Sequence, residues 1–396
     1  MPNLLDYLEW RGDLTLAESP LNEVDNLIFS LLSYVDLENI VPGHGKRGVT
    51  VREAAAEYFF THDGKDPHPL GLIIPVDILT LFRRMAHTRR FRDLILEGYV
   101  NEISESRETQ FSAVTVRMPD DRLFVAFRGT DDTVVGWKED FRLSVLDEVP
   151  AQTMAADYLN RLDLTPETKL FVGGHSKGGN LAVWGAVHAE ERVRERVQAA
   201  WSNDGPGFSE GTVTSEAYQA LAPRIRILFP EDSLVGLLLE HDKGYTVIKS
   251  NRKGLLQHDG LSWEVLGGSF LRAEALSPIG IRNDTVVRER IDSMTREERR
   301  ELIGIMFSLI ESTGSKTLTE LRGEGMRGAL TMMKSFRELP PERQDTAAYL
   351  WDKLVKGKGQ TPVRKSGEPR AVKTQRRRKA KIRVVIFPCL KGGVRF

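Results

Sequence analysis

The stretch KLFVGGHSKGGNLAVWGA, residues 169–186, constrains the fold of this chain more than any other. A run of apolar residues ends in glycines, one serine follows, and a run rich in small residues comes after it. We predict a strand over residues 170–174, a turn at Ser176, and a helix that begins at Lys177. A chain that passes from strand to helix within about two residues holds the residue at the turn in a strained backbone conformation.

Two glycines stand on either side of the serine, in the order Gly174-His175-Ser176-Lys177-Gly178. Any side chain at Gly174 or Gly178 would collide across so tight a turn. The pattern G-x-S-x-G between a strand and a helix is typical of the nucleophile elbow of α/β hydrolases. We therefore predict that Ser176 is a catalytic nucleophile. The amide of Lys177, at the start of the helix, is the expected first donor to an oxyanion.

A second copy of the same pattern, GFSEG over residues 207–211, serves as an internal comparison. The residues SNDGP separate it from the preceding apolar run, and Pro206 and the polar flanks favour a loop. The strand–turn–helix context is therefore expected at Ser176 and not at Ser209.

Strand-like and helix-like segments alternate from residue 150 to about residue 265, which predicts a mostly parallel sheet with helices on both faces. Three strand-like segments precede them between residues 97 and 129, and MPDDR between the last two favours a hairpin. The sequence thus predicts an α/β-hydrolase fold with an N-terminal helical extension and C-terminal helices. The expected regions are an N-terminal helical extension, a catalytic core, a C-terminal helical region and a basic tail, over residues 1–95, 96–270, 271–355 and 356–396.

A serine nucleophile needs a base, and the base needs an acid to orient it. In this fold they follow the serine in the order Asp or Glu, then His. Of the eight histidines, His241 and His258 lie beyond the elbow strand and its helix. His258 follows the apparent last strand, YTVIKS, so we predict His258 as the base. For the acid, ILFPEDS places Asp232 after the second strand beyond the elbow, and NDGPG places Asp204 one strand earlier. The sequence favours Asp232, with Asp204 as the alternative.

The segment after residue 122 carries a resemblance to a known family. A strand that ends in Phe-Arg-Gly-Thr at Thr130 is followed by Trp137 and then by Asp140. Over roughly residues 110–265 the chain resembles the class 3 lipases, the fungal triacylglycerol lipase type. The resemblance implies that Thr130 supplies the second oxyanion donor and that Asp140 holds Thr130 in place. The blocks AFRGTDDT, GGHSKGGN, NDGPGF and ILFPEDS also resemble an uncharacterised bacterial branch of lipase-like hydrolases, over about residues 3–350.

Charge is distributed unevenly along the 396 residues. Residues 353–396 contain 15 Lys and Arg residues and one acidic residue, which leaves 41 basic and 55 acidic residues before them. This tail lacks an apolar pattern, so we expect it to be disordered. A weak contact of the tail with anionic membranes is the alternative, and nucleic acid is not favoured. No apolar run approaches the roughly 18 residues of a membrane span, and charges interrupt the N-terminus, so we expect a cytoplasmic protein.

The sequence therefore predicts a serine esterase or lipase-like hydrolase that cleaves carboxylic esters through an acyl-enzyme. Ser176 would attack, His258 would act as base and then acid, and Asp232 would orient it. The expected partner is a small-molecule or lipid ester, and lipid is favoured from the resemblance alone. No cofactor or metal is implied. The alternative is a catalytically inactive binding or scaffold protein with the same fold.

Overall fold

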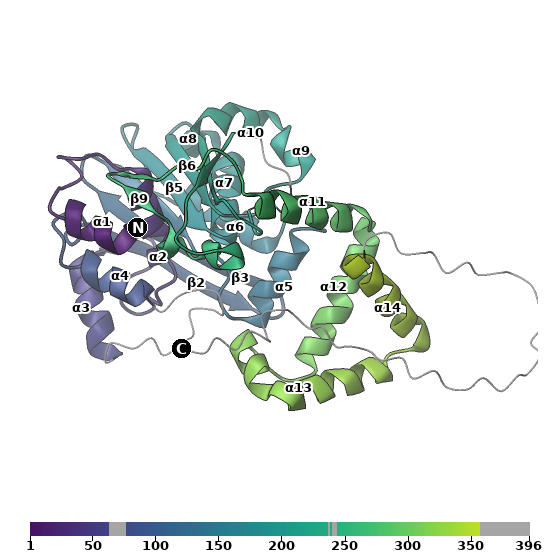
Figure 1. Ribbon diagram of the computed structural model, residues 1–396. Coiled ribbons are helices and arrows are strands. Elements are labelled where there is room, and N and C mark those ends of the chain that lie inside the picture. The colour runs from purple at the N-terminus through teal and green to yellow at the C-terminus, as the bar shows by residue number, and fades with distance from the viewer. Residues whose placement is uncertain (63–76, 237, 240–243, 357–396) are drawn as a thin grey trace, which may run out of the picture.

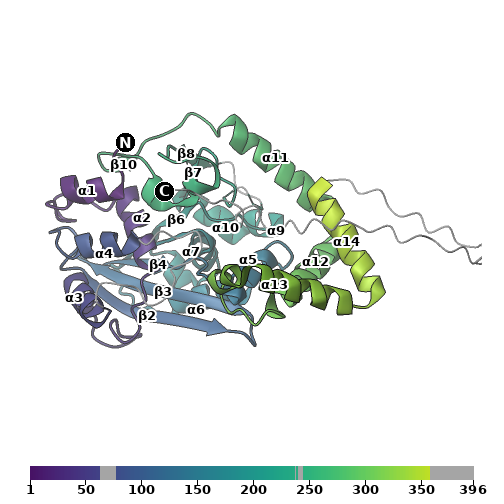
Figure 2. The ribbon, with the colours of Figure 1, turned by 60° about the horizontal axis from the view of Figure 1, so that its bottom comes forward.

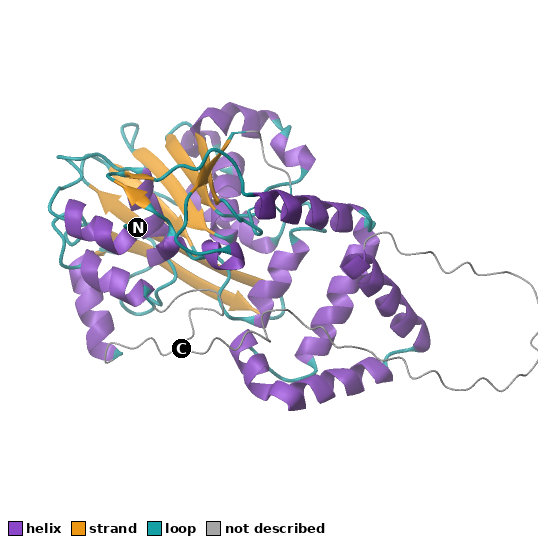
Figure 3. Ribbon diagram, in the orientation of Figure 1, coloured by secondary structure: helices purple, strands orange, loops and turns teal. Residues whose placement is uncertain are grey.

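A computed structural model of the chain describes residues 1–62, 77–236, 238–239 and 244–356 (Figure 1). Among these residues, eight strands form one sheet, and neighbours in the sequence are neighbours in the sheet. The first four strands pair antiparallel, and the fourth to the eighth pair parallel. The strands are β1 (Val49–Thr50), β2 (Ile95–Ser104), β3 (Thr109–Met118), β4 (Arg122–Phe127), β5 (Lys169–His175), β6 (Val197–Asn203), β7 (Ile225–Pro230) and β8 (Tyr245–Ile248). Helices cover the sheet on both faces, as predicted, and the chain has an α/β-hydrolase fold (Figure 3).

The two faces of the sheet bury two separate cores, which β4 illustrates. Successive side chains of a strand point to opposite faces. Phe124 and Ala126 pack with the N-terminal helices, whereas Leu123, Val125 and Phe127 pack with the helices of the other face. The N-terminal helices are α1 (Leu4–Arg11), α2 (Glu23–Leu32), α3 (Val51–Thr61) and α4 (Ile78–Met85), and the opposite face carries α6 (Pro150–Asn160) and α7 (Lys177–His188).

Side-chain caps define where the N-terminal helices begin. In α1, α2 and α3 a capping box joins the cap residue to the third residue of the helix, and each box satisfies backbone amides that lack helical partners. In α2 the acidic residue of the capping box, Asp25, also forms a fully buried ion pair with Arg90. The Nε of Arg90 lies 2.8 Å from Asp25 Oδ1. A buried charge pair thus joins α2 to the segment between α4 and β2.

Short elements connect the later strands of the sheet or follow the last of them. They are α5 (Val134–Arg142), α8 (Glu191–Arg194), α9 (Glu210–Val213), α10 (Glu216–Leu221), three 3₁₀ turns (Ala222–Arg224, Gly254–His258 and Gly260–Ser262), and a hairpin of β9 (Val265–Leu266) and β10 (Ser269–Phe270). Of these, α5 follows the loop after β4, and the Gly254–His258 turn follows β8. Both therefore lie after strands of the sheet, at positions from which their side chains can reach the elbow.

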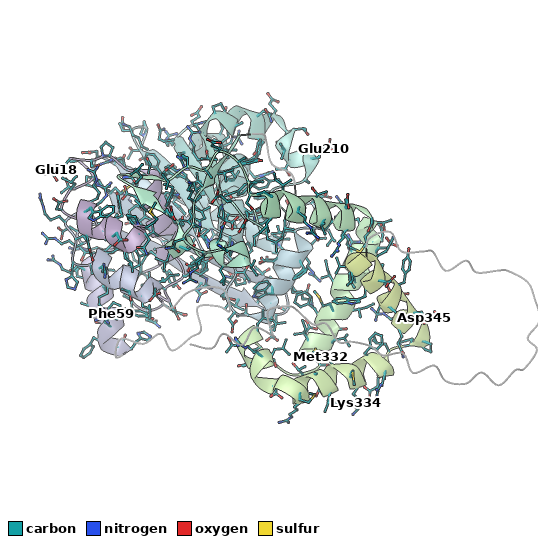
Figure 4. All side chains as sticks on the ribbon, in the orientation of Figure 1. Glu18, Phe59, Glu210, Met332, Lys334 and Asp345 are labelled. Carbon is teal, nitrogen blue, oxygen red and sulfur yellow. The ribbon has the colours of Figure 1, made fainter. Side chains whose placement is uncertain are left out.

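Four C-terminal helices lie at the opposite end of the molecule from α1, α3 and α4, as Figures 1 and 2 both show. They are α11 (Pro278–Asp292), α12 (Arg296–Glu311), α13 (Leu318–Glu338) and α14 (Pro341–Lys356). A small apolar core joins α12 and α13 to α5. It includes Val134 of α5, Ile303 and Phe307 of α12, and Met332 of α13, which Figure 4 labels. The C-terminal helices therefore cover α5 and the loops beside it.

Several expectations from the sequence are met, and others lie outside the described part of the chain. The helices expected before residue 95 and the three strands between residues 97 and 129 are present. The division into four regions stays a prediction. The basic tail from residue 357 onward lies outside the described residues, and with it the alternative of a contact with anionic membranes. His241 lies outside them as well. Within the described residues, no helix is long and apolar enough to cross a membrane.

Candidate active site

Ser176 occupies the turn between β5 and α7, as the sequence predicts. Its φ of 57° and ψ of −134° place it in a conformation that costs about 1–3 kcal/mol for a residue with a side chain. A Cβ at Gly174 would lie 2.1 Å from the backbone of Gly178. A Cβ at Gly178 would lie 2.1 Å from the carbonyl oxygen of Phe127. The two glycines are therefore what allows this elbow to form.

His258 lies in the turn after β8 and pairs with Asp204. Nδ1 of His258 lies 2.7 Å from Oδ2 of Asp204, and both side chains are buried. Because a carboxylate only accepts hydrogen bonds, Nδ1 carries the hydrogen, and Nε2 is the nitrogen that can accept a proton. Asp204 is itself held in place, since its other oxygen accepts from the hydroxyl of Ser233 and, at 3.2 Å, from the amide of Gly236.

The prediction that Asp232 orients His258 is wrong. Among the described residues, Oδ2 of Asp232 accepts from the amide of Gly254 at 2.8 Å and from the side chain of Gln257 at 3.3 Å. Its other oxygen accepts from the hydroxyl of Ser277. Asp232 therefore fastens the segments after β8 together. The alternative, Asp204, follows β6, which pairs directly with the elbow strand β5, and this adjacency brings it to His258.

Thr130 and Asp140 make the contact that the resemblance to class 3 lipases implies. The hydroxyl of Thr130, in the loop after β4, donates to Oδ2 of Asp140 on α5. Burial raises the pKa of Asp140 to about 6, and the ammonium of Lys177, 3.8 Å from Oδ1, opposes this rise. Thr130 and Lys177 line the same cavity as Ser176. The two residues expected to supply oxyanion donors are thus brought to one place.

His175, between Gly174 and the serine, was not singled out from the sequence. Its Nε2 donates to the carbonyl oxygen of His258 at 2.7 Å, so its Nδ1 accepts from the hydroxyl of Tyr34 at 3.2 Å. Burial and then the neighbouring His258 imidazole lower the pKa of His175 to about 3. This neutral imidazole ties the backbone of His258 to the elbow. Its only sequence signal was its place inside the G-x-S-x-G pattern.

A cavity of about 390 Å³ lies over Ser176. His258, Thr130, Asp140 and Lys177 line it together with Ser176. Most of its other lining residues are apolar and come from α5, the loop after β7 and the C-terminal helices: Trp137, Phe141, Leu143, Val235, Leu238, Ile291, Met294, Leu302, Ile303, Met306 and Leu354. Small-molecule sites commonly have this character, with a few polar groups in a largely apolar hollow.

The second G-x-S-x-G segment has a different structure, as expected. Ser209 is the N-cap of the short helix α9, with an extended φ of −66° and ψ of 153°. Its hydroxyl accepts from the amide of Thr212 at 3.3 Å. No strand leads directly into this serine within the described residues, so the pattern here is a helix start.

Fold and site together place the chain among proteins with an α/β-hydrolase fold and a serine at the elbow after the central strand. The model of the Mbeg1-like family matches residues 85–308, and the chain belongs to that family. A comparison with curated proteins found no match. The chain is similar to the crystal structure of M37 lipase, with 15% identity, a TM-score of 0.34, and coverage of 55% of this chain and 70% of the other. It is also similar to a Rhizomucor miehei lipase propeptide complex, with 16% identity, a TM-score of 0.29, and coverage of 39% of this chain and 57% of the other. At these TM-scores neither likeness bears on function, and the resemblance to class 3 lipases stays a prediction.

Proposed function

We propose that this protein is a serine hydrolase that cleaves carboxylic esters at Ser176. The observation that carries the proposal is the Asp204–His258 pair, whose imidazole lines the same cavity as the strained serine. This set of groups has the composition and order of a Ser–Asp–His triad, with Asp204 as the acid. The buried elbow glycines and the strained φ support the same reading, because a plain strand-to-helix connection does not need either.

The proposed reaction begins when Nε2 of His258 takes the proton of the Ser176 hydroxyl and the serine oxygen attacks the ester carbonyl. Asp204 holds the imidazole through Nδ1 and stabilises its charged form. The backbone amides of Lys177 and Thr130 would donate to the developing oxyanion, since the hydroxyl hydrogen of Thr130 is donated to Asp140. His258 then returns the proton to the leaving alcohol, and a water repeats the sequence on the acyl-enzyme.

A lipid ester is the favoured substrate class. The support is the cavity, whose walls are mostly apolar side chains from α5, the loop after β7 and the C-terminal helices. An acyl chain gains about 0.8 kcal/mol for each methylene that it buries against such walls. A hydrolase for small polar esters would gain little from this lining.

The proposal is tested by labelling the full chain with a fluorophosphonate probe and by measuring hydrolysis of a soluble short-chain ester. Wild-type protein should label and turn over, and Ser176→Ala should do neither while keeping its thermal midpoint. Ser209→Ala, at the second G-x-S-x-G segment, is the matched control and should label like the wild type. Wild-type protein that neither labels nor hydrolyses any ester would favour the inactive scaffold instead.

A further inference from the structure

Two oppositely charged side chains are completely buried directly behind the proposed oxyanion site. Nζ of Lys177 lies 3.0 Å from Oε2 of Glu139, and neither side chain is exposed to solvent. Lys177 follows the nucleophile, and Glu139 precedes Asp140 on α5. The proposed reaction assigns a task to the backbone amide of Lys177 but none to its side chain.

The three N–H donors of the ammonium and both oxygens of the carboxylate are hydrogen-bonded. Besides Glu139, the ammonium of Lys177 donates to the backbone carbonyl of Gln110 at 3.0 Å and to its side-chain oxygen at 2.7 Å. The carboxylate of Glu139 accepts from the amides of Gln110 at 3.1 Å and Ala151 at 3.0 Å. The pair thus makes five different hydrogen bonds, and because each bond has its own direction, together they restrict where both side chains can lie.

The network connects the segments that carry the two oxyanion groups. Lys177 begins α7, Gln110 lies on β3, and Glu139 lies on α5 beside Asp140, which holds Thr130. Nε2 of Gln110 also donates to the carbonyl oxygen of Gly129 at 3.4 Å, directly before Thr130. Both ends of the proposed oxyanion site are therefore tied to one buried charge pair.

We infer that the Lys177 side chain is a positioning group, which through Glu139 fixes its own backbone amide against Thr130 in the geometry that an oxyanion requires. The inference rests on the proposed function. Space-filling alone does not account for the pair, since apolar side chains of similar volume commonly replace buried ion pairs without loss of stability. Directional hydrogen bonds are what an apolar pair lacks. Donors that are misplaced by about 1 Å lose much of their effect on the transition state.

The test uses the full chain with the double variant Lys177→Met/Glu139→Gln. It removes both charges at nearly constant volume and keeps the Lys177 backbone amide. The measurements are kcat and KM on a soluble short-chain ester, the affinity of an alkyl boronic acid, and the thermal midpoint. Concentrations are expressed per fluorophosphonate-reactive site, so that unfolded protein does not count. A boronate bound to the serine mimics the tetrahedral intermediate and needs the oxyanion donors.

We expect kcat and boronate affinity to fall together by roughly 10- to 100-fold, with KM changed by less than about threefold. The matched control is Arg90→Met/Asp25→Asn, which removes another completely buried ion pair, one that does not line the cavity. It should lower the thermal midpoint and leave kcat per reactive site unchanged. Glu139→Gln alone is the milder variant to use if the double variant does not fold, and it should show the same joint loss to a smaller degree.

Unchanged kcat and boronate affinity in the folded variants would overturn the inference and leave the proposed function standing. So would an equal loss of kcat in the Arg90→Met/Asp25→Asn control, because the effect would then be one of general stability. If wild-type protein neither hydrolyses esters nor reacts with the probe, the proposed function fails, and the inference fails with it. Ester hydrolysis and probe labelling of the wild-type protein therefore distinguish failure of the proposed function from failure of the inference alone.

Discussion

Asp204 and His258 are 54 residues apart in the sequence, yet Oδ2 of Asp204 lies 2.7 Å from Nδ1 of His258. The contact depends on two strand ends. Asp204 follows β6 directly with a φ of 51°, and its amide donates to the carbonyl oxygen of Leu228 on β7 at 2.8 Å. The aspartate is thus held at the end of β6, beside the elbow. The turn after β8 places His258 within hydrogen-bond distance of it.

This pair separates the two candidate acids in an experiment. Asp204→Asn should lower kcat by roughly 10⁴-fold, because the amide favours the wrong imidazole tautomer. Asp232→Asn should leave kcat within about tenfold of the wild type and lower the free energy of unfolding by about 1–3 kcal/mol, since Asp232 is buried and bonded to structural groups. Steady-state kinetics and urea unfolding of both variants measure the two quantities. A larger kinetic loss for Asp232→Asn would contradict the assignment.

The elbow was predictable from the sequence because its causes are local. Gly174, Ser176 and Gly178 lie within five consecutive residues, and the clash of any added Cβ follows from the turn itself. The helices on both faces of the sheet were predictable for the same reason, because their apolar periodicity is visible within short segments of the sequence. The position of His258 after the last strand of the sheet was also predictable, since it depends only on strand order.

The carboxylate that pairs with His258 and the buried charge pair were not predictable in the same way. Acidic residues follow both β6 and β7, and the choice between Asp204 and Asp232 depends on which loop turns toward His258. That direction is set by contacts such as Ser277 with Asp232, 45 residues apart. Lys177 and Glu139 are 38 residues apart, and each looks like an ordinary surface charge until α5 packs against β3. Packing between distant segments determines which charged residues pair, and a single sequence does not show which segments pack together.

A second prediction compares one elbow glycine with a glycine of the other G-x-S-x-G segment. Gly174→Ala should lower the free energy of unfolding by more than about 4 kcal/mol or prevent folding, because its Cβ would overlap the Gly178 backbone. Gly211→Ala is the matched control, since a Cβ there meets nothing closer than 3.9 Å. In helix α9 it should raise the free energy of unfolding by about 0.4–1 kcal/mol. Equal effects in urea unfolding would show that the elbow is not sterically closed.

A third prediction tests whether the apolar cavity receives the acyl chain. Met306 on α12 lines the cavity, and Met306→Trp should fill part of it. We expect kcat/KM for long-chain p-nitrophenyl esters to fall at least about tenfold while that for the acetate stays unchanged, since a lost methylene site costs about 1–3 kcal/mol. Ser308→Trp, exposed on the same helix, is the control and should keep the wild-type chain-length profile. A uniform change along the ester series would argue against an acyl site here.

The last prediction concerns the acid sensitivity of the fold. The native protein protonates His175 only near pH 3, whereas a histidine in the unfolded chain does so near pH 6.5. Between these values the unfolded state binds more protons, so the free energy of unfolding falls as the pH falls, by about 2 kcal/mol at pH 5 from this residue.

His175→Gln keeps a donor to the His258 carbonyl and cannot titrate. In urea unfolding at several pH values, the variant should therefore lose about 2 kcal/mol less stability than the wild type between neutral pH and pH 5. Tyr34→Phe removes the hydroxyl that bonds to His175 and keeps the imidazole, so it should lower stability and retain the wild-type slope. Equal slopes in His175→Gln and wild-type protein would show that the imidazole is not the group that resists protonation.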